Sequence, residues 1–597
     1  MTNESLGINQ IDFLVRAMIE RAPAWTMIRE LVKNAIESAE QAAGKKEVKI
    51  TSRLYREVPK LVIWNTGPGL SDTELVKITQ LSSSVHKTLD LDANFGVGAK
   101  VSSLANNKVG MIYRSCKDGA VSQVILAYDS NIQNYVRVKM KIGEEELAVI
   151  DVTKAARKED ADLSIDWTEV MLLGNSDDQN TVEMPLATEG RTDKGYIATA
   201  LYRRFYRIPE GVKIKIDGDF TRFPTPRNFE TIWDRREKHF SRYEEVRSDR
   251  YGLLVHFFHD PEHKSASSMR QSASGALGST TTTMCLVHKD EMYSVKTGVS
   301  WSAAAPAFGI PFGSKELCVH VELDDKLARP SQYRERLIRK ENGADIAPEE
   351  FAHVVREVMP QWVKEVVSAA SPDRAADYDD LQKELQLLLD EYKLKSAGRK
   401  KNDDGMPSEE RKSGEPVGQG EQSSGAGGSG GGDRATNRNV FEVPEGATRT
   451  KSLDVFDRAP EIIPLTTEEQ VAEKDLVGKA AYFVQETGQL FVNCLYDAVG
   501  NMVGEIEVRA ADETDVELVR ELATEAARRA IMLQVGKAVV FALAKRNATT
   551  WSDEELRTAL SKVCLSIAAD DYRVALNDAH KYVRQQLRAR QASSAVA

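Results

Sequence analysis

The residues best suited to chemistry in this sequence lie in the stretch Glu30-Leu31-Val32-Lys33-Asn34. Glu30 and Asn34 are four residues apart in a helical pattern, so their side chains leave the same face of the helix. A carboxylate in that place can polarise a water molecule, and a carboxamide oxygen can hold a divalent cation. The pair is therefore suited to activating water beside a bound metal ion.

Two glycine-rich turns follow, on either side of a short helical segment. The first is Asn65-Thr66-Gly67-Pro68-Gly69 and the second is Phe95-Gly96-Val97-Gly98-Ala99-Lys100. Glycine lets backbone N–H groups approach an anion closely, and the second turn opens a helix whose N-terminus favours phosphate. Lys100 lies in the first turn of that helix, where a bound phosphate would offset an otherwise unfavourable cation. We expect the three segments to converge on ATP and Mg²⁺.

The elements that must position these residues follow from the hydrophobic pattern. A helix over 24–43 carries the apolar stripe Met27, Leu31, Ala35 and Ala39, and strands over 47–54 and 60–64 lead into the first glycine turn. A short helix follows a Ser-Asp cap at residue 71. The polar stretch 80–94, which contains Lys87, is expected to be a lid, and a helix over 99–105 follows it.

The rest of the N-terminal third alternates strands with helices. Strands are expected near 108–115, 121–128, 135–141, 147–152 and 168–173, then a helix over 193–206 and a strand over 212–217. Such mixing predicts an α+β layer with one face of the sheet covered. We assign residues 1–217 to this domain and 218–345 to a second α+β unit with strands at 251–258, 283–288 and 317–323.

The C-terminal part has a different composition. Residues 346–397 predict helices, among them one with Leu381, Leu385, Leu388 and Tyr392 on a seam suited to intramolecular packing or a dimer contact. Residues 398–440 are rich in glycine and serine and predict a flexible linker. Residues 441–597 predict a β-meander, with strands at 479–485, 489–496 and 502–509, followed by long helices near 514–545 and 552–588.

Composition excludes several classes of protein. The 597 residues include no apolar run long enough to cross a membrane, and the start of the chain has no secretory pattern. Five scattered cysteines favour a reducing, cytoplasmic setting over a disulfide framework or a zinc site. His256 and His259 are at odd spacing on a strand, so they face opposite sides and do not predict a metal centre. The net charge of −11 does not favour nucleic acid globally, although a local basic surface can.

The three chemical segments resemble the N, G1 and G2 boxes of the GHKL ATPases, the superfamily of gyrase, heat-shock-ninety chaperones, histidine kinases and MutL. The nearest in pattern are the microrchidia (MORC) ATPases and type IIB topoisomerase ATPase subunits. The resemblance covers about residues 10–220 and extends more loosely to 345 as a transducer-like domain. It implies a Bergerat-fold ATPase sandwich and a Mg²⁺-dependent ATPase that works as an ATP-gated homodimeric clamp on DNA.

The resemblance also assigns roles. It implies that Glu30 is the general base, that Asn34 is the Mg²⁺ ligand, and that Gly67 and Gly69 line the adenine and ribose pocket. Gly96, Gly98 and Lys100 match the phosphate-cradling turn, Thr168 matches a threonine that helps to hold adenine, and Lys87 lies in the lid. One departure is Asn65, because the family has an aspartate that accepts a hydrogen bond from adenine. An asparagine oxygen can still accept that bond.

The resemblance leaves several alternatives open. One of Lys326, Arg329, Arg334 and Arg336 is expected to be the transducer cation that reaches the γ-phosphate. Besides DNA, the partner of the clamp could be a protein client, as in the heat-shock-ninety chaperones, or a partner subunit. Asn65 also fits a nucleotide-sensing interaction subunit with little turnover. Residues 441–597 are expected to form a dimerisation or interaction domain whose helices hold a constitutive dimer, and the sequence does not show what else they contact.

Overall fold

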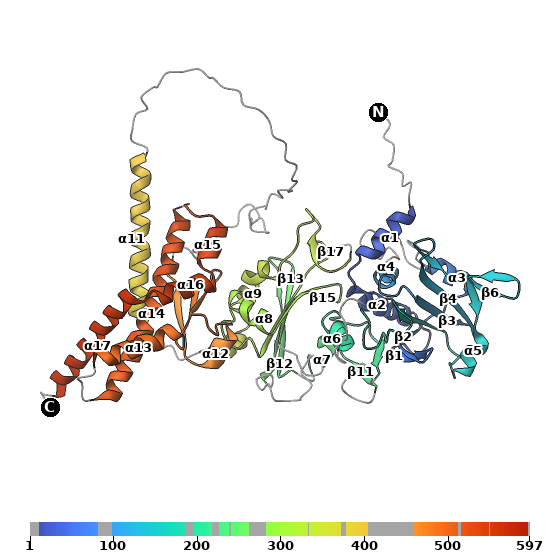
Figure 1. Ribbon diagram of the computed structural model, residues 1–597, viewed down its shortest axis with the longest axis horizontal. Coiled ribbons are helices and arrows are strands. Elements are labelled where there is room, and N and C mark those ends of the chain that lie inside the picture. The colour runs from blue at the N-terminus through green and yellow to red at the C-terminus, as the bar shows by residue number, and fades with distance from the viewer. Residues whose placement is uncertain are drawn as a thin grey trace, which may run out of the picture. The chain divides into compact units, whose positions relative to one another are not determined.

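The computed structural model describes residues 11–80, 98–186, 196–217, 226–237, 240–261, 282–331, 333–371, 378–403, 458–510, 515–548 and 550–594. The chain forms two compact units, each a mixture of helices and sheets (Figure 1). The first comprises Met1–Trp301 and Gly313–Lys364, and the second comprises Ser302–Phe312 and Glu365–Ala597. None of the described helices is long and apolar enough to span a membrane.

The first unit contains a nine-stranded sheet in the order β11-β10-β1-β2-β9-β3-β4-β5, with β8 also paired to β4. Most neighbours are antiparallel, but β1 and β10 run parallel, with Glu47 opposite Lys213. The strands are β1 (Glu47–Tyr55), β2 (Val58–Thr66), β3 (Gly110–Lys117), β4 (Ala120–Asp129), β5 (Asn134–Arg137), β8 (Val149–Asp151), β9 (Trp167–Gly174), β10 (Lys213–Ile216) and β11 (Arg227–Phe229), and a separate hairpin joins β6 (Met140–Ile142) to β7 (Glu145–Leu147).

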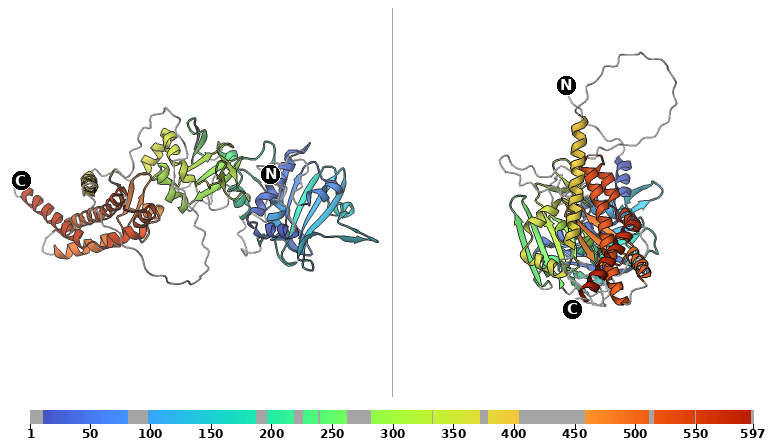
Figure 2. Two further views of the ribbon diagram at one scale, coloured as in Figure 1. Left: turned by 90° about the horizontal axis from the view of Figure 1, so that it is seen from above. Right: turned by 90° about the vertical axis from the view of Figure 1, so that its left-hand side faces the viewer.

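Helices cover one face of this sheet, as the left view of Figure 2 shows. They are α1 (Ile11–Arg21), α2 (Thr26–Glu40), α3 (Asp72–Ile78), α4 (Gly98–Leu104) and α6 (Tyr196–Tyr202). The short helix α5 (Thr153–Lys158) packs its Ala156 against Cys116, Val121 and Trp167 on the opposite face. The expected stripe of α2 is buried, with Met27, Leu31 and Ala39 against Val48 and Ile63 of the sheet. Each large side chain buried in this way contributes roughly 1.5–3 kcal/mol, so the core fixes where α2 lies.

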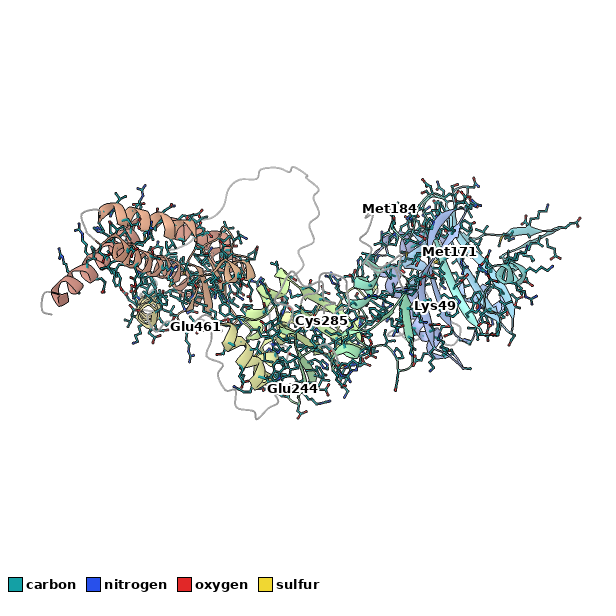
Figure 3. All side chains as sticks on the ribbon, turned by 90° about the horizontal axis from the view of Figure 1, so that it is seen from below. Lys49, Met171, Met184, Glu244, Cys285 and Glu461 are labelled. Carbon is teal, nitrogen blue, oxygen red and sulfur yellow. The ribbon has the colours of Figure 1, made fainter. Side chains whose placement is uncertain are left out.

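A five-stranded sheet in the order β12-β13-β16-β14-β15 completes the first unit. Figure 3 labels Met171 in the first sheet and Cys285 in the second. From residue 232 to residue 370 the chain forms these elements in order: α7 (Ile232–Arg235), β12 (Arg242–Ser248), β13 (Leu253–His259), β14 (Thr283–His288), β15 (Glu291–Thr297), α8 (Val299–Ala304), β16 (Leu317–Glu322), β17 (Ala328–Pro330), β18 (Leu337–Arg339), η4 (Pro348–Phe351), α9 (Ala352–Val358) and α10 (Gln361–Ala370). The three strands expected in this region are all present.

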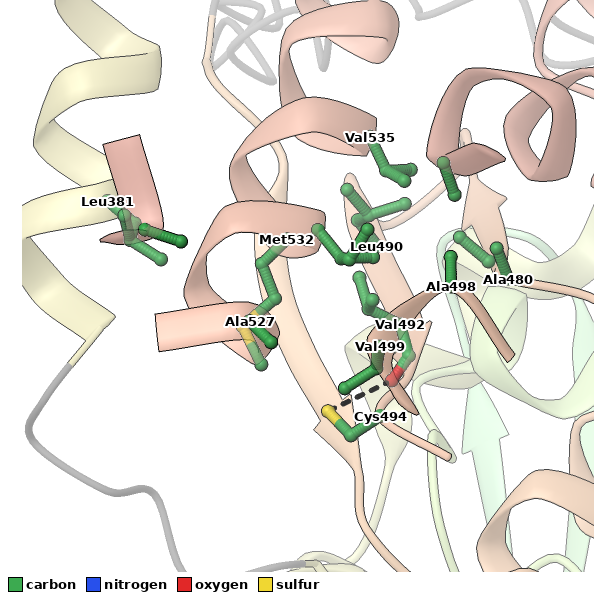
Figure 4. Close-up of a cluster of buried hydrophobic side chains, with 14 of the residues drawn as sticks. Leu381, Ala480, Leu490, Val492, Cys494, Ala498, Val499, Ala527, Met532 and Val535 are labelled. Carbon is green, nitrogen blue, oxygen red and sulfur yellow. Dashed lines mark hydrogen bonds between the residues drawn. The ribbon is translucent and has the colours of Figure 1, made fainter. Parts of the chain in front are cut away.

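The second unit packs helices against a small sheet in the order β19-β21-β20. Leu381 of α11, Met532 of α14 and Leu490 of β21 lie in one buried cluster (Figure 4). Its elements are η3 (Ala305–Phe308), α11 (Asp379–Asp403), β19 (Glu461–Leu465), α12 (Glu468–Glu473), β20 (Ala481–Val484), β21 (Gln489–Asn493), α13 (Asp497–Arg509), α14 (Val516–Asn547), α15 (Asp553–Ala559), α16 (Lys562–Asp570) and α17 (Arg573–Ser594).

The structure corrects the expected β-meander of the C-terminal part. The segment 502–509 belongs to helix α13, whereas the strands at 479–485 and 489–496 are present as β20 and β21. In α13 the buried residues Ala498, Met502 and Ile506 recur every four positions, which is a helical face. The glycines at 500 and 504 do not mark turns. The missing third strand is β19, which pairs with β21 in parallel.

Two helix expectations also change. The single long helix near 552–588 is three helices, because Ser561 caps α16 through the Cys564 N–H at 3.3 Å and the chain leaves the helix again at Asp571. The helix α11 continues to Asp403, past the expected start of the linker at 398. Residues 404–440 lie outside the described part of the chain.

Candidate functional site

Helix α2 brings both glycine turns to one side of itself. The Cβ of an alanine at 98 would overlap the Glu30 carboxylate and lie 2.7 Å from its Cδ. Two turns further along the helix, the Cβ of an alanine at 67 would lie 2.9 Å from the Ser38 carbonyl oxygen. Glu30 and Ser38 are eight residues apart, about 12 Å along the helix axis. Gly67 of the first glycine turn and Gly98 of the second therefore approach α2 about two helical turns apart.

Asn34 lies between these two contacts. It is four residues from Glu30 and four from Ser38, so the three side chains form a ladder on one helix face. Glu30 is only 5% exposed, while Asn34 is exposed to solvent. The ladder thus offers one accessible amide oxygen between the two sites of close backbone approach. A carboxamide oxygen in such a place suits Mg²⁺, which keeps most of its water ligands and takes few from protein.

The first glycine turn is held tightly by the sheet beside it. The Gly67 N–H donates to the Asp166 carbonyl at 3.3 Å. Gly69 has φ +61°, and any Cβ there would overlap the Cys116 carbonyl oxygen. Both conditions demand glycine, one for its left-handed conformation and the other for space. The turn is therefore built so that backbone, rather than side chains, faces its surroundings.

Where the apolar core ends, polar side chains continue the helix-covered face of the sheet. We call these three residues, Asn65, Thr168 and Ser115, the polar floor. Asn65, Thr168 and Ser115 sit side by side on β2, β9 and β3, since Thr168 is opposite both of the others in the strand register. The Thr168 and Ser115 hydroxyls are 2.8 Å apart, and Ser115 accepts from the Leu70 N–H at 2.8 Å. Ser115 therefore ties the first glycine turn to Thr168, and the sequence pattern gave no sign of this.

The orientation of Asn65 bears on its departure from aspartate. Its Nδ2 donates to the Thr66 carbonyl at 2.9 Å, and the side chain is 5% exposed. This bond engages the amide nitrogen with the backbone and leaves the side-chain oxygen as an acceptor. Asn65 can therefore present the same acceptor that an aspartate would, without the charge.

Lys100 has a structural contact that the sequence did not predict. Its ammonium donates to the Ile78 carbonyl at 2.6 Å, at the end of α3, and to the Gln80 carbonyl just beyond it. Burial lowers the Lys100 pKa to about 8. The residue thus joins α4 to α3, and its role as a phosphate contact remains a prediction. Lys87 and Gly96, the other two residues expected here, lie outside the described residues.

The Glu30 carboxylate is bound by its neighbour Arg29. One terminal nitrogen of Arg29 pairs with Glu30, while the other and Nε pair with Glu291, with Nε 3.1 Å from Glu291 Oε2. All three residues are almost fully buried. Burial disfavours the Arg29 charge, but Glu30 and Glu291 outweigh it and hold the pKa of Arg29 above its usual value. The sequence analysis missed Arg29 and Glu291, which are 262 positions apart.

Glu291 begins β15 of the second sheet and has a second cation, Arg204, at 2.7 Å. Burial opposes its charge, but Arg204 and Arg29 outweigh burial and lower the Glu291 pKa to about 2. Two guanidinium groups and two carboxylates therefore form a neutral buried set. Charges that are buried in this way are tolerated because each has a partner.

The four candidate transducer cations differ in the contacts that they make. Arg334 itself has φ +54°, and its carbonyl accepts from Arg204 at 2.8 Å. Burial raises the pKa of Tyr293, whose hydroxyl is 3.4 Å from Glu291, and the positive charge of Arg334 lowers that pKa by less. Arg336 pairs instead with Asp345 at 3.0 Å. Arg329 lies in the β17–β18 hairpin, and Lys326 is exposed in the turn before it. Arg334 is therefore the candidate that the geometry associates with the charge set.

The histidines of β13 face opposite sides, as their spacing predicts. His256 is buried between the Tyr243 hydroxyl at 3.1 Å and the Glu322 carboxylate at 2.9 Å, whereas His259 contacts Ser241 and Glu316. Among the described residues, no three His, Cys, Asp or Glu side chains gather in a group that could hold a metal ion.

Two comparisons bear on the identity of the chain. A scan against models of known protein families found no match, and neither did a search of curated proteins.

Proposed function

We propose that the first unit is a Mg²⁺-dependent ATPase of the GHKL type, with its nucleotide along the exposed face of α2. The ladder of Glu30, Asn34 and Ser38, with one glycine turn at each end, is the observation that carries this proposal. Its length of about 12 Å suits a nucleotide that reaches from a base pocket to a terminal phosphate. The nine-stranded sheet with helices on one face supports the Bergerat sandwich as its fold.

Each residue then has a role. The acceptor oxygen of Asn65 and the hydroxyl of Thr168 would hold the adenine edge on the polar floor, beside Gly67 and Gly69. The backbone at Gly98 would approach the phosphates, and Asn34 would hold the Mg²⁺, which neutralises phosphate charge when bound. Glu30 would accept a proton from the attacking water. These residue types fit a nucleotide and a magnesium ion.

Arg334 is our choice for the cation that reaches the γ-phosphate. Its carbonyl bond to Arg204 places its turn beside the charge set that includes Glu30, whereas Arg336 is already paired with Asp345. A cation that meets only the triphosphate distinguishes ATP from ADP, which is what a nucleotide-gated clamp needs. Arg334→Ala should slow hydrolysis while ADP affinity stays the same.

A hydrolysis assay tests the proposal directly. Glu30→Gln should lower the rate of phosphate release at least 100-fold and leave ATP affinity within about threefold, because a general base contributes about 10²–10⁴-fold. Asn34→Ala should raise the Mg²⁺ concentration needed for activity. The matched control is Glu40→Gln, an exposed carboxylate on the same helix, which should not change either quantity. If Glu30→Gln hydrolyses ATP like the parent chain, the proposal is wrong.

For the complete molecule we propose an ATP-gated homodimeric clamp that acts on DNA, from the resemblance to the MORC and topoisomerase ATPases. Long duplex DNA should then stimulate hydrolysis, with stimulation that falls steeply across a salt series. Stimulation by unfolded protein but not by DNA would instead support a chaperone. Both measurements use the full chain in the same assay.

A second candidate function is a nucleotide sensor with little turnover. The ion pair between Arg29 and the Glu30 carboxylate favours it, because a carboxylate bound to a guanidinium accepts a proton poorly. Nucleotide binding with no phosphate release, with or without DNA, would establish the sensor and exclude the ATPase.

A further inference from the structure

Two carboxylates, one on helix α2 and one on strand β15, share one guanidinium group. Arg29 lies on α2 and binds Glu30 on the same helix, while its Nε and second terminal nitrogen bind Glu291 on β15. Glu291 is 3% exposed, and its carboxylate also forms an ion pair with Arg204 at 2.7 Å. The groups facing Glu291 are thus Arg29, Arg204, the Tyr293 hydroxyl at 3.4 Å and, more distantly, Lys33.

We propose that Glu291 is a positioning residue for Glu30, acting through Arg29. With Glu291 in place, Arg29 divides its donors between two carboxylates, and Glu30 receives only part of its charge. Without that second acceptor, Arg29 would bind Glu30 more fully, and Glu30 would accept a proton from water less readily. The effect of Glu291 on catalysis rests on the proposed ATPase function, which does not itself assign a role to Glu291.

Charge balance gives the proposal its direction. Two cations and two anions are buried together, so removing the Glu291 charge leaves Arg29 and Arg204 with Glu30, the partner of Arg29, as the one remaining carboxylate of the set. A buried cation without a partner is costly, and the nearest remaining anion takes up the interaction. The side chain of Glu30 would then be held against Arg29, and away from Asn34 and the exposed face of the helix.

The place of Glu291 is set by the second sheet. The turn between β14 and β15 has positive φ at Lys289 and Asp290, and backbone bonds attach it to the segment after α6. The Tyr206 N–H donates to the Asp290 carbonyl at 2.8 Å, and the Met292 N–H donates to the Arg204 carbonyl at 2.7 Å. A shift of this hairpin would therefore move Glu291 and change how Arg29 holds Glu30.

The test is Glu291→Gln in the full chain, which keeps the size of the side chain and removes its charge. We expect kcat for ATP hydrolysis to fall at least tenfold, with KM and ADP affinity within threefold. The acid limb of the kcat profile should also move to lower pH. The matched control is Glu322→Gln, because Glu322 is an ion-paired carboxylate of the same sheet that binds Arg207 and not Arg29. A kcat for Glu291→Gln equal to that of the parent or of the control overturns the inference.

A second measurement needs no ATP. In a double-mutant cycle of Glu30→Gln and Glu291→Gln, the combined loss of Tm should differ from the sum of the two single losses, because both side chains share Arg29. Additive losses overturn the inference. If Glu291→Gln does not fold, Arg29→Lys replaces it in the test. A lysine ammonium lacks the planar fork with which the guanidinium holds both carboxylates, so this substitution should also lower kcat. Absence of ATP hydrolysis in the parent overturns the proposed ATPase and the catalytic part, while the cycle still decides the coupling.

Discussion

At the scale of single residues, close packing explains most of the site. Gly67 and Gly98 lie so near Ser38 and Glu30 that no side chain fits at either position. Ser115 and Thr168 then attach the first glycine turn to the sheet through hydroxyl contacts. The exposed side chain in this frame is Asn34, so a ligand would meet backbone and one amide before it met charge.

Gly67→Ala should destabilise the first unit by about 1–3 kcal/mol, because the added methyl would press on the Ser38 carbonyl at 2.9 Å. Nucleotide affinity should fall as well, since the turn must shift. Urea unfolding and nucleotide titration measure the two effects. Gly44→Ala is the control, because nothing lies within 4 Å of a Cβ there. Equal stability of the two variants would contradict this account of the turn.

Lys100 predicts a particular dependence of stability on pH. Burial lowers its pKa to about 8, from the usual 10.5. Between these values the unfolded chain binds a proton that the folded chain has released, so the free energy of unfolding rises with pH across this window. The contribution is roughly 3 kcal/mol. Lys100→Met should remove this rise in the free energy of unfolding, measured from denaturant curves at pH 8, 9 and 10. A rise of the same size in the variant would show that Lys100 is not its source.

At the scale of elements, hydrophobic periodicity predicted some helices and strands correctly and misplaced others. The stripe of α2 and the strands β1, β2 and β9 were predicted correctly, because hydrophobic periodicity there agrees with the final burial. The strand expected at 502–509 was wrong, because the buried residues of α13 recur every four positions, and the turn expected at Gly500 lies inside that helix. β19 was missed because its partner β21 is supplied from far along the chain.

The seam of α11 provides an element-scale prediction. Leu385 is fully buried in the cluster with α14, whereas its neighbour Leu387 is 71% exposed. Leu385→Ala should cost about 2–5 kcal/mol in the second unit, and Leu387→Ala should cost little. Neither change should alter the mass measured by sedimentation, since the seam packs within the chain. A change of oligomeric state with Leu385→Ala would indicate that the seam also holds a dimer.

At the scale of the whole molecule, the division into two units separates the proposed nucleotide site from the C-terminal helices. The motifs of the site could be predicted because α2 and the two glycine turns lie within 71 positions of one another, from Glu30 to Lys100. The charge set could not be predicted, because neither Arg29 nor Glu291 belongs to a motif and 262 positions separate them. Only the fold shows that they meet.

The two units predict that ATP and Mg²⁺ will stabilise one part of the chain. A ligand at 100 times its Kd adds about 2.7 kcal/mol to the unit that binds it. Differential scanning calorimetry should show one transition that moves to higher temperature with the nucleotide and another that stays in place. Asn34→Ala should weaken the shift caused by Mg²⁺. Equal shifts of both transitions would contradict a site confined to the first unit.

The sharing of Arg29 by Glu30 and Glu291 also constrains how this protein is produced and dissected. The ribosome makes the helix that bears Arg29 262 positions before it makes the carboxylate at 291, so a nascent chain lacks one of the two carboxylates of the charge set until about half of the 597 residues are made. A recombinant fragment that stops at residue 217 would keep that imbalance permanently. Its kinetics would then describe an altered catalyst, and boundaries for expression are better placed beyond the second sheet.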